Sequence, residues 1–142
     1  MNKGIEHYKK TDVNTSSQGK LVVMLYDGAI KFLETALAAV GDKHKIDTVH
    51  NNIVKAQDII VELLASLNYD AGDIANRLAA IYTYMNKRLL EANVKKEREP
   101  IVEVIGYMKE LKDAWSKAAE SVSVPERPAT PALSAGKVNI TG

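Results

Sequence analysis

The stretch Ile46–Leu67, IDTVHNNIVKAQDIIVELLASL, decides the fold class of this 142-residue chain. Its apolar residues recur at alternating intervals of three and four, a spacing that places them along one side of an α-helix. The members of this series are Ile46, Val49, Ile53, Ala56, Ile60, Leu63 and Leu67. Such a seam needs other helices to cover it, so the stretch predicts a helical bundle.

Two further segments repeat the pattern, and no segment shows the strict alternation typical of a half-buried strand. The two series are Ile74, Leu78, Ile81, Met85, Leu89 and Ala92, and then Ile101, Val104, Met108, Leu111, Trp115, Ala118 and Val122. Short polar turns near Gly41, at Asn68–Gly72 and at Asn93–Glu99 separate the helical segments. Because short turns join antiparallel neighbours, we expect an all-α, antiparallel four-helix bundle over residues 15–122.

Residues typical of helix ends agree with these boundaries. The sequence TSSQ, which starts at Thr15, is a capping box that predicts the start of the first helix. Asp70 and Asp73 are the candidate caps of the third helix. Pro100 suits the first turn of the fourth helix, where its missing N–H costs nothing.

The two ends of the chain differ from this middle. Residues 1–14 form a short N-terminal arm that is polar apart from Ile5, Tyr8 and Val13. Residues 123–142 hold three of the four prolines and scarcely any helical pattern. A segment of this composition cannot bury enough apolar surface to offset the entropy of ordering, so we expect a disordered C-terminal tail.

The composition argues against several classes of partner. With 19 Lys+Arg against 18 Asp+Glu, the formal net charge of +1 gives no footprint for nucleic acid. No apolar run approaches the eighteen or so residues that cross a bilayer, and the N-terminus lacks the pattern of a secretory signal. The chain has no cysteine, which excludes disulfides and thiolate metal sites. We therefore expect a cytoplasmic protein that binds no nucleic acid and does not insert into membranes.

No catalytic or cofactor site can be placed on this sequence. The paired Glu-x-x-His signature of di-metal bundles is absent, and no glycine-rich phosphate loop exists. The closest approach to a metal site is Asp47 with His50, three residues apart on one helix and without a matching pair on another. We expect no enzymatic activity, no cofactor and no bound metal. The alternative hypothesis of a metal-dependent bundle enzyme rests on Asp47 and His50 alone.

The first helical segment carries more apolar surface than one buried face requires. The stretch Leu21–Leu33, LVVMLYDGAIKFL, spans an apolar arc of roughly 220°, whereas an ordinary surface helix needs a stripe of about 100°. Two interpretations of the interrupting Asp27-Gly28 pair remain open. Either Gly28 lets a neighbouring helix approach closely while Asp27 lies on the one polar strip, or the wide arc serves both the core and a helix from another chain.

Several short motifs follow one another along the chain. They are Ile5-x-x-Tyr8, MLYDG at Met24–Gly28, SL at Ser66–Leu67, YM at Tyr84–Met85 and EAN at Glu91–Asn93. With these motifs, residues 5–119 resemble the FliS family of flagellar secretion chaperones. The resemblance implies an antiparallel helical bundle that is not an enzyme.

The resemblance also implies partners and a site. A chaperone of this family binds the disordered C-terminal segment of flagellin in apolar helical grooves, prevents premature polymerisation and delivers it to the export gate of the flagellar type III apparatus. The partner-binding residues it implies here are Ile5, Tyr8, Leu21, Met24, Leu25 and Tyr26. Asp27 and Gly28 are structural parts of the same motif. The alternative is a self-associating structural bundle, such as a homodimer, with no secretion client.

Overall fold

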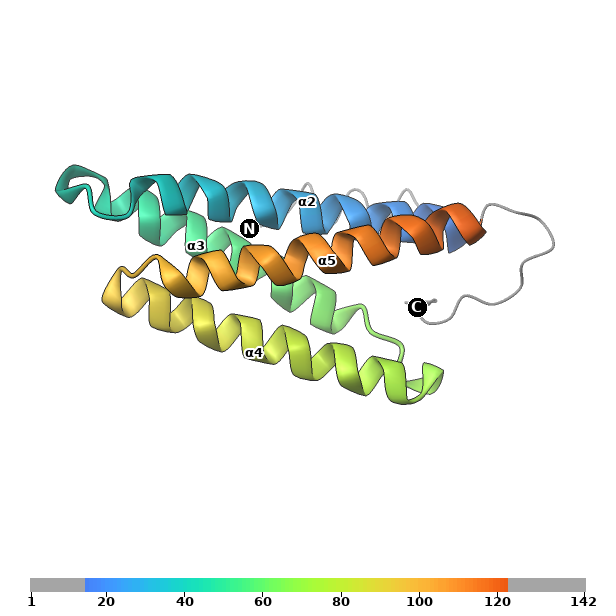
Figure 1. Cartoon of the computed structure of the whole chain (residues 1–142). Coiled ribbons are helices and arrows are strands. Elements are labelled where there is room, and N and C mark those ends of the chain that lie inside the picture. Colours follow the sequence, from blue (N-terminus) through green and yellow to red (C-terminus); the bar gives the residue numbers. More distant parts are fainter. Residues whose placement is uncertain (1–14, 123–142) are drawn as a thin grey trace.

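The computed structural model describes the backbone of residues 15–122 and the side chains of residues 18–118. The helices are α2 (Thr15–Ala39), α3 (Ile46–Ala65), α4 (Asp73–Lys95) and α5 (Glu99–Val122), with 3₁₀ turns η1 (Lys43–Lys45) and η2 (Tyr69–Ala71). No strand occurs in this span, and successive helices run in opposite directions (Figure 1). The predicted all-α four-helix bundle is confirmed. The arm at residues 1–14 and the tail at residues 123–142 lie outside the described residues.

The four helices form a closed ring in which α2 is the most closely packed. Helix α2 contacts α3 and α5 extensively, whereas α4 makes lighter contacts with α3 and α5. In Figure 1, α2 and α5 lie side by side, while α4 and α5 are closest at their shared turn and separate toward the opposite end. Within residues 15–122, the first and last helices, α2 and α5, therefore close the bundle, and α2 lies diagonally opposite α4.

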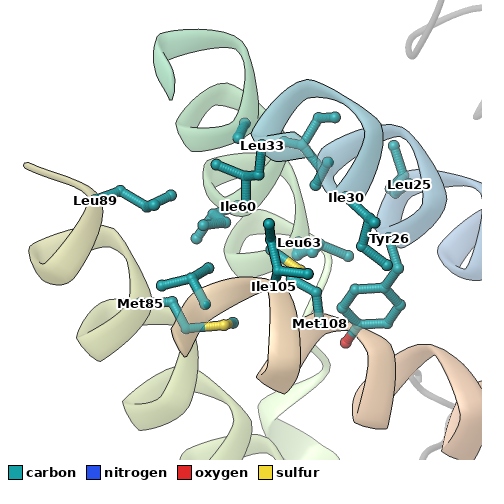
Figure 2. Close-up of a cluster of buried hydrophobic side chains, with 14 of the residues drawn as sticks. Leu25, Tyr26, Ile30, Leu33, Ile60, Leu63, Met85, Leu89, Ile105 and Met108 are labelled. Atoms are coloured by element: carbon teal, nitrogen blue, oxygen red, sulfur yellow. The ribbon is translucent and has the colours of Figure 1, made fainter. Parts of the chain in front are cut away.

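Apolar side chains from all four helices meet in one core, part of which is drawn in Figure 2. The largest fully buried side chains are Tyr26, Leu33, Ile53, Ile60, Leu63, Tyr82, Met85, Leu89, Ile101 and Met108. Most of these belong to the predicted seams, but Ile46 is 53% exposed and Ile81 is 37% exposed. The buried series of α4 is instead Ala75, Leu78, Tyr82, Met85, Leu89 and Ala92. The prediction placed Ile74 and Ile81 in the core, whereas the buried positions are those of Ala75 and Tyr82. These two residues also keep the spacing of three and four with Leu78 and Met85.

The ends of α2 agree with the expected boundaries. The helix begins at Thr15, and the contacts of the predicted capping box lie outside the described side chains. At the other end α2 stops at Ala39, and Gly41 adopts a φ of +96°, which favours glycine because a side chain would be strained there. The carboxylate of Asp42 then accepts a hydrogen bond from the backbone N–H of His44 at 2.9 Å, and this contact starts η1.

The start of α4 differs from the prediction. Gly72 occupies the N-cap position, so no side chain caps the helix, and the predicted caps at Asp70 and Asp73 are wrong. Asp73 is the first residue of α4, where its carboxylate pairs with Nε of Arg77 at 2.8 Å. A carboxylate in the first turn still favours the helix through its dipole. Pro100 lies in the first turn of α5, as predicted.

Candidate functional site

The structure separates the predicted partner-binding residues into three groups. These residues are Ile5, Tyr8, Leu21, Met24, Leu25 and Tyr26. Ile5 and Tyr8 lie outside the described residues. Leu21, Leu25 and Tyr26 are buried, with exposed fractions of 8%, 6% and 0%, whereas Met24 is 46% exposed. Of the four predicted positions on α2, Met24 therefore offers the accessible apolar surface.

The broad apolar arc of α2 is filled largely by two helix–helix interfaces. Both α3 and α5 pack along α2, one on each flank. The buried apolar side chains of α2 are those of Leu21, Val22, Leu25, Tyr26, Ala29, Ile30, Leu33, Ala36 and Ala39. Two flanking interfaces require a wider apolar arc than the single face of a surface helix, so most of the surplus needs no external partner.

The Asp27-Gly28 pair contacts both neighbours of α2. The Asp27 carboxylate pairs with Nζ of Lys112 from α5 at 2.9 Å and with Nζ of Lys31 on its own helix at 3.3 Å. The hydrogen bond from Lys112 is the main reason that the pKa of Asp27 is lowered. A Cβ at Gly28 would lie 3.5 Å from Cδ1 of Ile59 on α3, an ordinary van der Waals contact. The close helix approach predicted for Gly28 therefore leaves room for a methyl group.

A buried tyrosine pair crosses the bundle from α2 to α4. The hydroxyls of Tyr26 and Tyr82 are hydrogen-bonded to each other, and the ring centroids are 6.4 Å apart at an interplanar angle of 46°. Burial is the main cause that raises the pKa of both phenols. The indole of Trp115 on α5 lies beside the pair, but its buried Nε1 makes no hydrogen bond of good geometry with the described part of the chain. The pair thus joins two diagonal helices by a polar contact inside the apolar core.

Apolar side chains that the heptad analysis missed lie on the surface of α3 and α4. Val61 on α3 is 54% exposed, and Leu90 and Val94 on α4 are 57% and 74% exposed. All three fall outside the heptad series of their helices. A large apolar residue outside such a series is the sequence feature that could have identified them as exposed. Large apolar side chains on the solvent side of a helix are candidates for contact with another chain.

Polar contacts join α3 to α4 alongside these apolar residues. The side-chain amide of Asn93 lies 2.9 Å from Nδ1 of His50, and Nε2 of Gln57 donates to the backbone carbonyl of Asn86 at 3.4 Å. The two contacts are seven residues apart on each helix, which is two turns. The α3–α4 interface therefore combines heptad packing in the core with hydrogen bonds at its edge.

The described residues bring together neither a metal cluster nor a membrane span. Asp47 and His50 are not joined by a third His, Asp or Glu within residues 15–122. Every helix in that range is too short or too polar to cross a bilayer. An open hollow between α2 and the start of α3 is lined partly by Lys31, Glu34 and Lys45. Thr35, Ala38, Ala39 and Thr48 complete its wall, and none of the predicted partner-binding residues lines it.

Comparison with known proteins adds to this geometry. The family model described as "Flagellar protein FliS" matches residues 1–122. The chain belongs to the FliS family. The match covers the N-terminal arm and all four helices and ends with α5. The resemblance seen in the sequence motifs is thereby confirmed.

Several curated relatives of this FliS-family chain carry the name "Flagellar secretion chaperone FliS". The relative from Bacillus subtilis (strain 168) is 37% identical over 114 residues, which are 80% of this chain and 84% of the relative. The relative from Vibrio cholerae serotype O1 is 34% identical over 122 residues, 82% of this chain and 89% of the relative. The relative from Escherichia coli (strain K12) is 32% identical over 132 residues, 89% of this chain and 96% of the relative.

Proposed function

We propose that this FliS-family protein is a cytoplasmic chaperone for the disordered C-terminal segment of flagellin. It prevents premature polymerisation of that segment and delivers it to the export gate of the flagellar type III apparatus. The observation that supports the proposal is the family match over residues 1–122, together with relatives named as flagellar secretion chaperones. A secretion chaperone acts by binding a secreted client, so the proposed role is not catalytic.

The distribution of exposed apolar side chains suits a client that wraps around the bundle. Met24 on α2, Val61 on α3 and Leu90 on α4 are each about half exposed, and each lies on a different helix. A single helix docked on the bundle lies along one pair of helices, whereas a disordered segment that folds on binding can follow several. Burial of one such side chain is worth roughly 1.5–3 kcal/mol, so the loss of any one contact is measurable.

In this proposal the buried residues of the MLYDG region support the site from beneath. Met24 contacts the client, while Leu21, Leu25 and Tyr26 hold α2 in place from the core. Substitution of a buried residue therefore lowers stability, whereas substitution of Met24 lowers client affinity with little effect on the fold.

The arm residues Ile5 and Tyr8 are proposed to contact the client as well. Both lie within the family match and, with Val13, supply the apolar side chains of a mainly polar segment. The double change Ile5→Ala, Tyr8→Ala is expected to weaken client binding by about tenfold or more, equivalent to roughly 1.4 kcal/mol, while the melting temperature barely moves. Tighter binding would identify the arm as a lid, and a large loss of thermal stability would place both residues in the core.

Isothermal titration calorimetry tests the proposal with the full chain and a synthetic peptide of the flagellin C-terminal segment. We expect binding in the micromolar range or tighter, a negative heat-capacity change and a gain of helical circular dichroism, because the peptide buries apolar surface as it folds. Met24→Lys should weaken binding. The matched control is Ala38→Lys, also exposed on α2 but about 21 Å away at 1.5 Å per residue, and it should bind normally.

The same titration separates this function from the self-associating bundle. Absence of heat and of any helical gain at micromolar concentration would contradict the chaperone proposal. Light scattering that shows a stable dimer in that case would support the structural alternative. A monomer that binds the peptide would exclude it.

A further inference from the structure

Two tyrosines and a carboxylate form an ordered group on the surface where α4 packs against α5. Tyr84 on α4 and Tyr107 on α5 both donate their hydroxyls to Oε2 of Glu103, at 2.7 and 3.2 Å. Their ring centroids are 6.2 Å apart with an interplanar angle of 72°, an edge-to-face arrangement. We call this group, Tyr84, Glu103 and Tyr107, the tyrosine patch.

The tyrosine patch is held rigid by an arginine beneath it. Nε of Arg88 donates to Oε1 of Glu103 at 2.7 Å, and its guanidinium also donates to Oε1 of Glu91 at 2.6 Å. The hydrogen bond from Arg88 is the main cause that lowers the pKa of Glu103, so this carboxylate is ionised at neutral pH. Because Arg88 and Glu103 are each only 28% exposed, the network orders side chains that would otherwise move freely.

Negative charge outweighs positive charge around the two rings. One guanidinium, that of Arg88, faces the carboxylates of Glu91 and Glu103, and Glu110 lies close enough to Tyr107 to raise its pKa. The pKa of each tyrosine is raised chiefly by its hydrogen bond to Glu103, and the opposing influence of Arg88 is smaller. With Lys87, which follows Tyr84 by three residues on α4, the surroundings of the patch hold three carboxylates and two cations, a net charge of −1.

The patch also offers apolar surface to a partner. Tyr84 is 43% exposed and Tyr107 37% exposed, with Ile81 37% exposed on the same side of α4. Both hydroxyls donate to Glu103, so the partly exposed rings supply the apolar surface of the patch. At Gly106, next to Tyr107, an added Cβ would meet no atom within 4 Å, so this part of α5 is open. Tyrosine and arginine are, with tryptophan, enriched in interface hot spots.

We propose that the tyrosine patch is a docking surface for a lysine- or arginine-bearing segment of a second protein. Cations bind over the faces of tyrosine rings, and the surplus carboxylates strengthen that preference, while Ile81 accepts an apolar neighbour of the cation. Helix α4 lies diagonally opposite α2, which carries Met24. On α4, the proposed client contact Leu90 lies about 120° around the helix from Tyr84 at 100° per residue. A second protein can therefore dock on the tyrosine patch while the client contacts Met24 and Leu90, and the proposal does not depend on the identity of the client.

NMR titration of the uniformly ¹⁵N-labelled full chain tests this surface. The probe is a synthetic amphipathic helical peptide with lysines on one face and leucines on the other, and the matched probe has glutamate in place of each lysine. With the lysine peptide, we expect chemical-shift changes in α4 and α5 around the tyrosine patch, and a dissociation constant that rises with salt. The glutamate peptide should bind at least tenfold more weakly.

Two variants and a control locate the binding. Glu110→Lys reverses a charge outside the hydrogen-bonded network, and Tyr107→Ala removes a ring; each should weaken lysine-peptide binding about fivefold or more. Asp47→Lys makes the same charge reversal on the exposed surface of α3 and should leave binding unchanged. Shift changes confined to α2 or α3, equal binding of the glutamate peptide, or an affinity that Glu110→Lys leaves unchanged would each overturn the proposal. Calorimetry with the flagellin peptide is unaffected by that outcome, so the two proposals fail separately.

Discussion

The hydroxyl pair of Tyr26 and Tyr82 makes a sharp prediction about stability. Either hydroxyl can be removed by a change to phenylalanine that keeps the ring in place. In Tyr26→Phe the hydroxyl of Tyr82 stays buried without its partner, and in Tyr82→Phe the reverse holds. In the double variant neither hydroxyl remains, so no unpaired polar group is created at the pair.

The magnitude follows from the burial of both groups. The side chains are 0% and 1% exposed, so an orphaned hydroxyl cannot turn to bulk water. Leaving one buried polar group unpaired costs about 1–3 kcal/mol, whereas replacing both partners by apolar groups of the same shape is nearly neutral. Each single variant is therefore expected to lose about 1–3 kcal/mol of unfolding free energy, and the double variant less than about 1 kcal/mol.

The assay uses the chain's single tryptophan. Trp115 is 4% exposed, so its fluorescence reports unfolding of the bundle, with far-UV circular dichroism as a second probe. Urea titrations of the wild type, both single variants and the double variant complete a double-mutant cycle. A double variant that loses the sum of the two single losses would show that the hydroxyls do not stabilise each other, and the argument would be refuted.

The same pair predicts a fall in stability at alkaline pH. Burial raises the pKa of both phenols above the ordinary value of 10.0. Above about pH 10 the tyrosines of the unfolded chain release their protons while the buried pair retains them. The contribution of the pair is therefore complete below pH 10 and is lost as the pH rises further. The double phenylalanine variant should show a shallower loss over that range.

Three other changes test separate parts of the bundle. Gly106→Ala should raise the unfolding free energy by about 0.5–1 kcal/mol, because glycine is unfavourable within a helix and the added methyl group meets no other atom. Gly41→Ala should lower the unfolding free energy, because alanine is strained at the positive φ of that residue. Thermal melts of both variants beside the wild type measure the two effects. Asp27→Asn should lower the unfolding free energy by less than about 1 kcal/mol, and the loss should disappear in high salt, because the ion pair with Lys112 is partly exposed. Equal losses of unfolding free energy at low and high salt would contradict this. A chain that ends at Val122 should bind the flagellin peptide as the full chain does in calorimetry, because residues 123–142 are proline-rich and outside the family match.

Much of the fold could be predicted from the sequence because helical spacing reports which side of each helix is covered. The predicted series on α3 is buried from Val49 to Leu63, and that on α5 is buried at Ile101, Val104, Met108 and Trp115. Leu67, Leu111 and Ala118 are only partly buried. The series on α4 failed at Ile81, which is exposed, while Tyr82 beside it is buried. A tyrosine can be buried when its hydroxyl is paired, and here the partner is Tyr26, which lies 56 residues away in the sequence. No local pattern contains that information.

The site was harder to predict because a wide apolar arc has two physical explanations. The arc of α2 indicated surface left over for a client, yet α3 and α5 cover most of it, and Met24 stays exposed. The exposed apolar side chains Val61 and Leu90 were overlooked because the heptad analysis considered only residues that keep its spacing. Apolar residues out of register on an otherwise polar face are therefore candidates for docking surfaces.

The closure of the bundle by its first and last helices has a consequence for synthesis on the ribosome. Helix α2 is complete at Ala39, but α5, which covers one of its flanks, is complete at Val122, 83 residues later. At 5–20 residues per second, translation of that interval takes about 4–17 s. Until α5, which begins at Glu99, has been made, the nascent chain carries an apolar flank on α2 that its own sequence does not cover. The growing polypeptide, more than the finished protein, is therefore the form whose uncovered apolar surface must avoid aggregation or be bound by another protein.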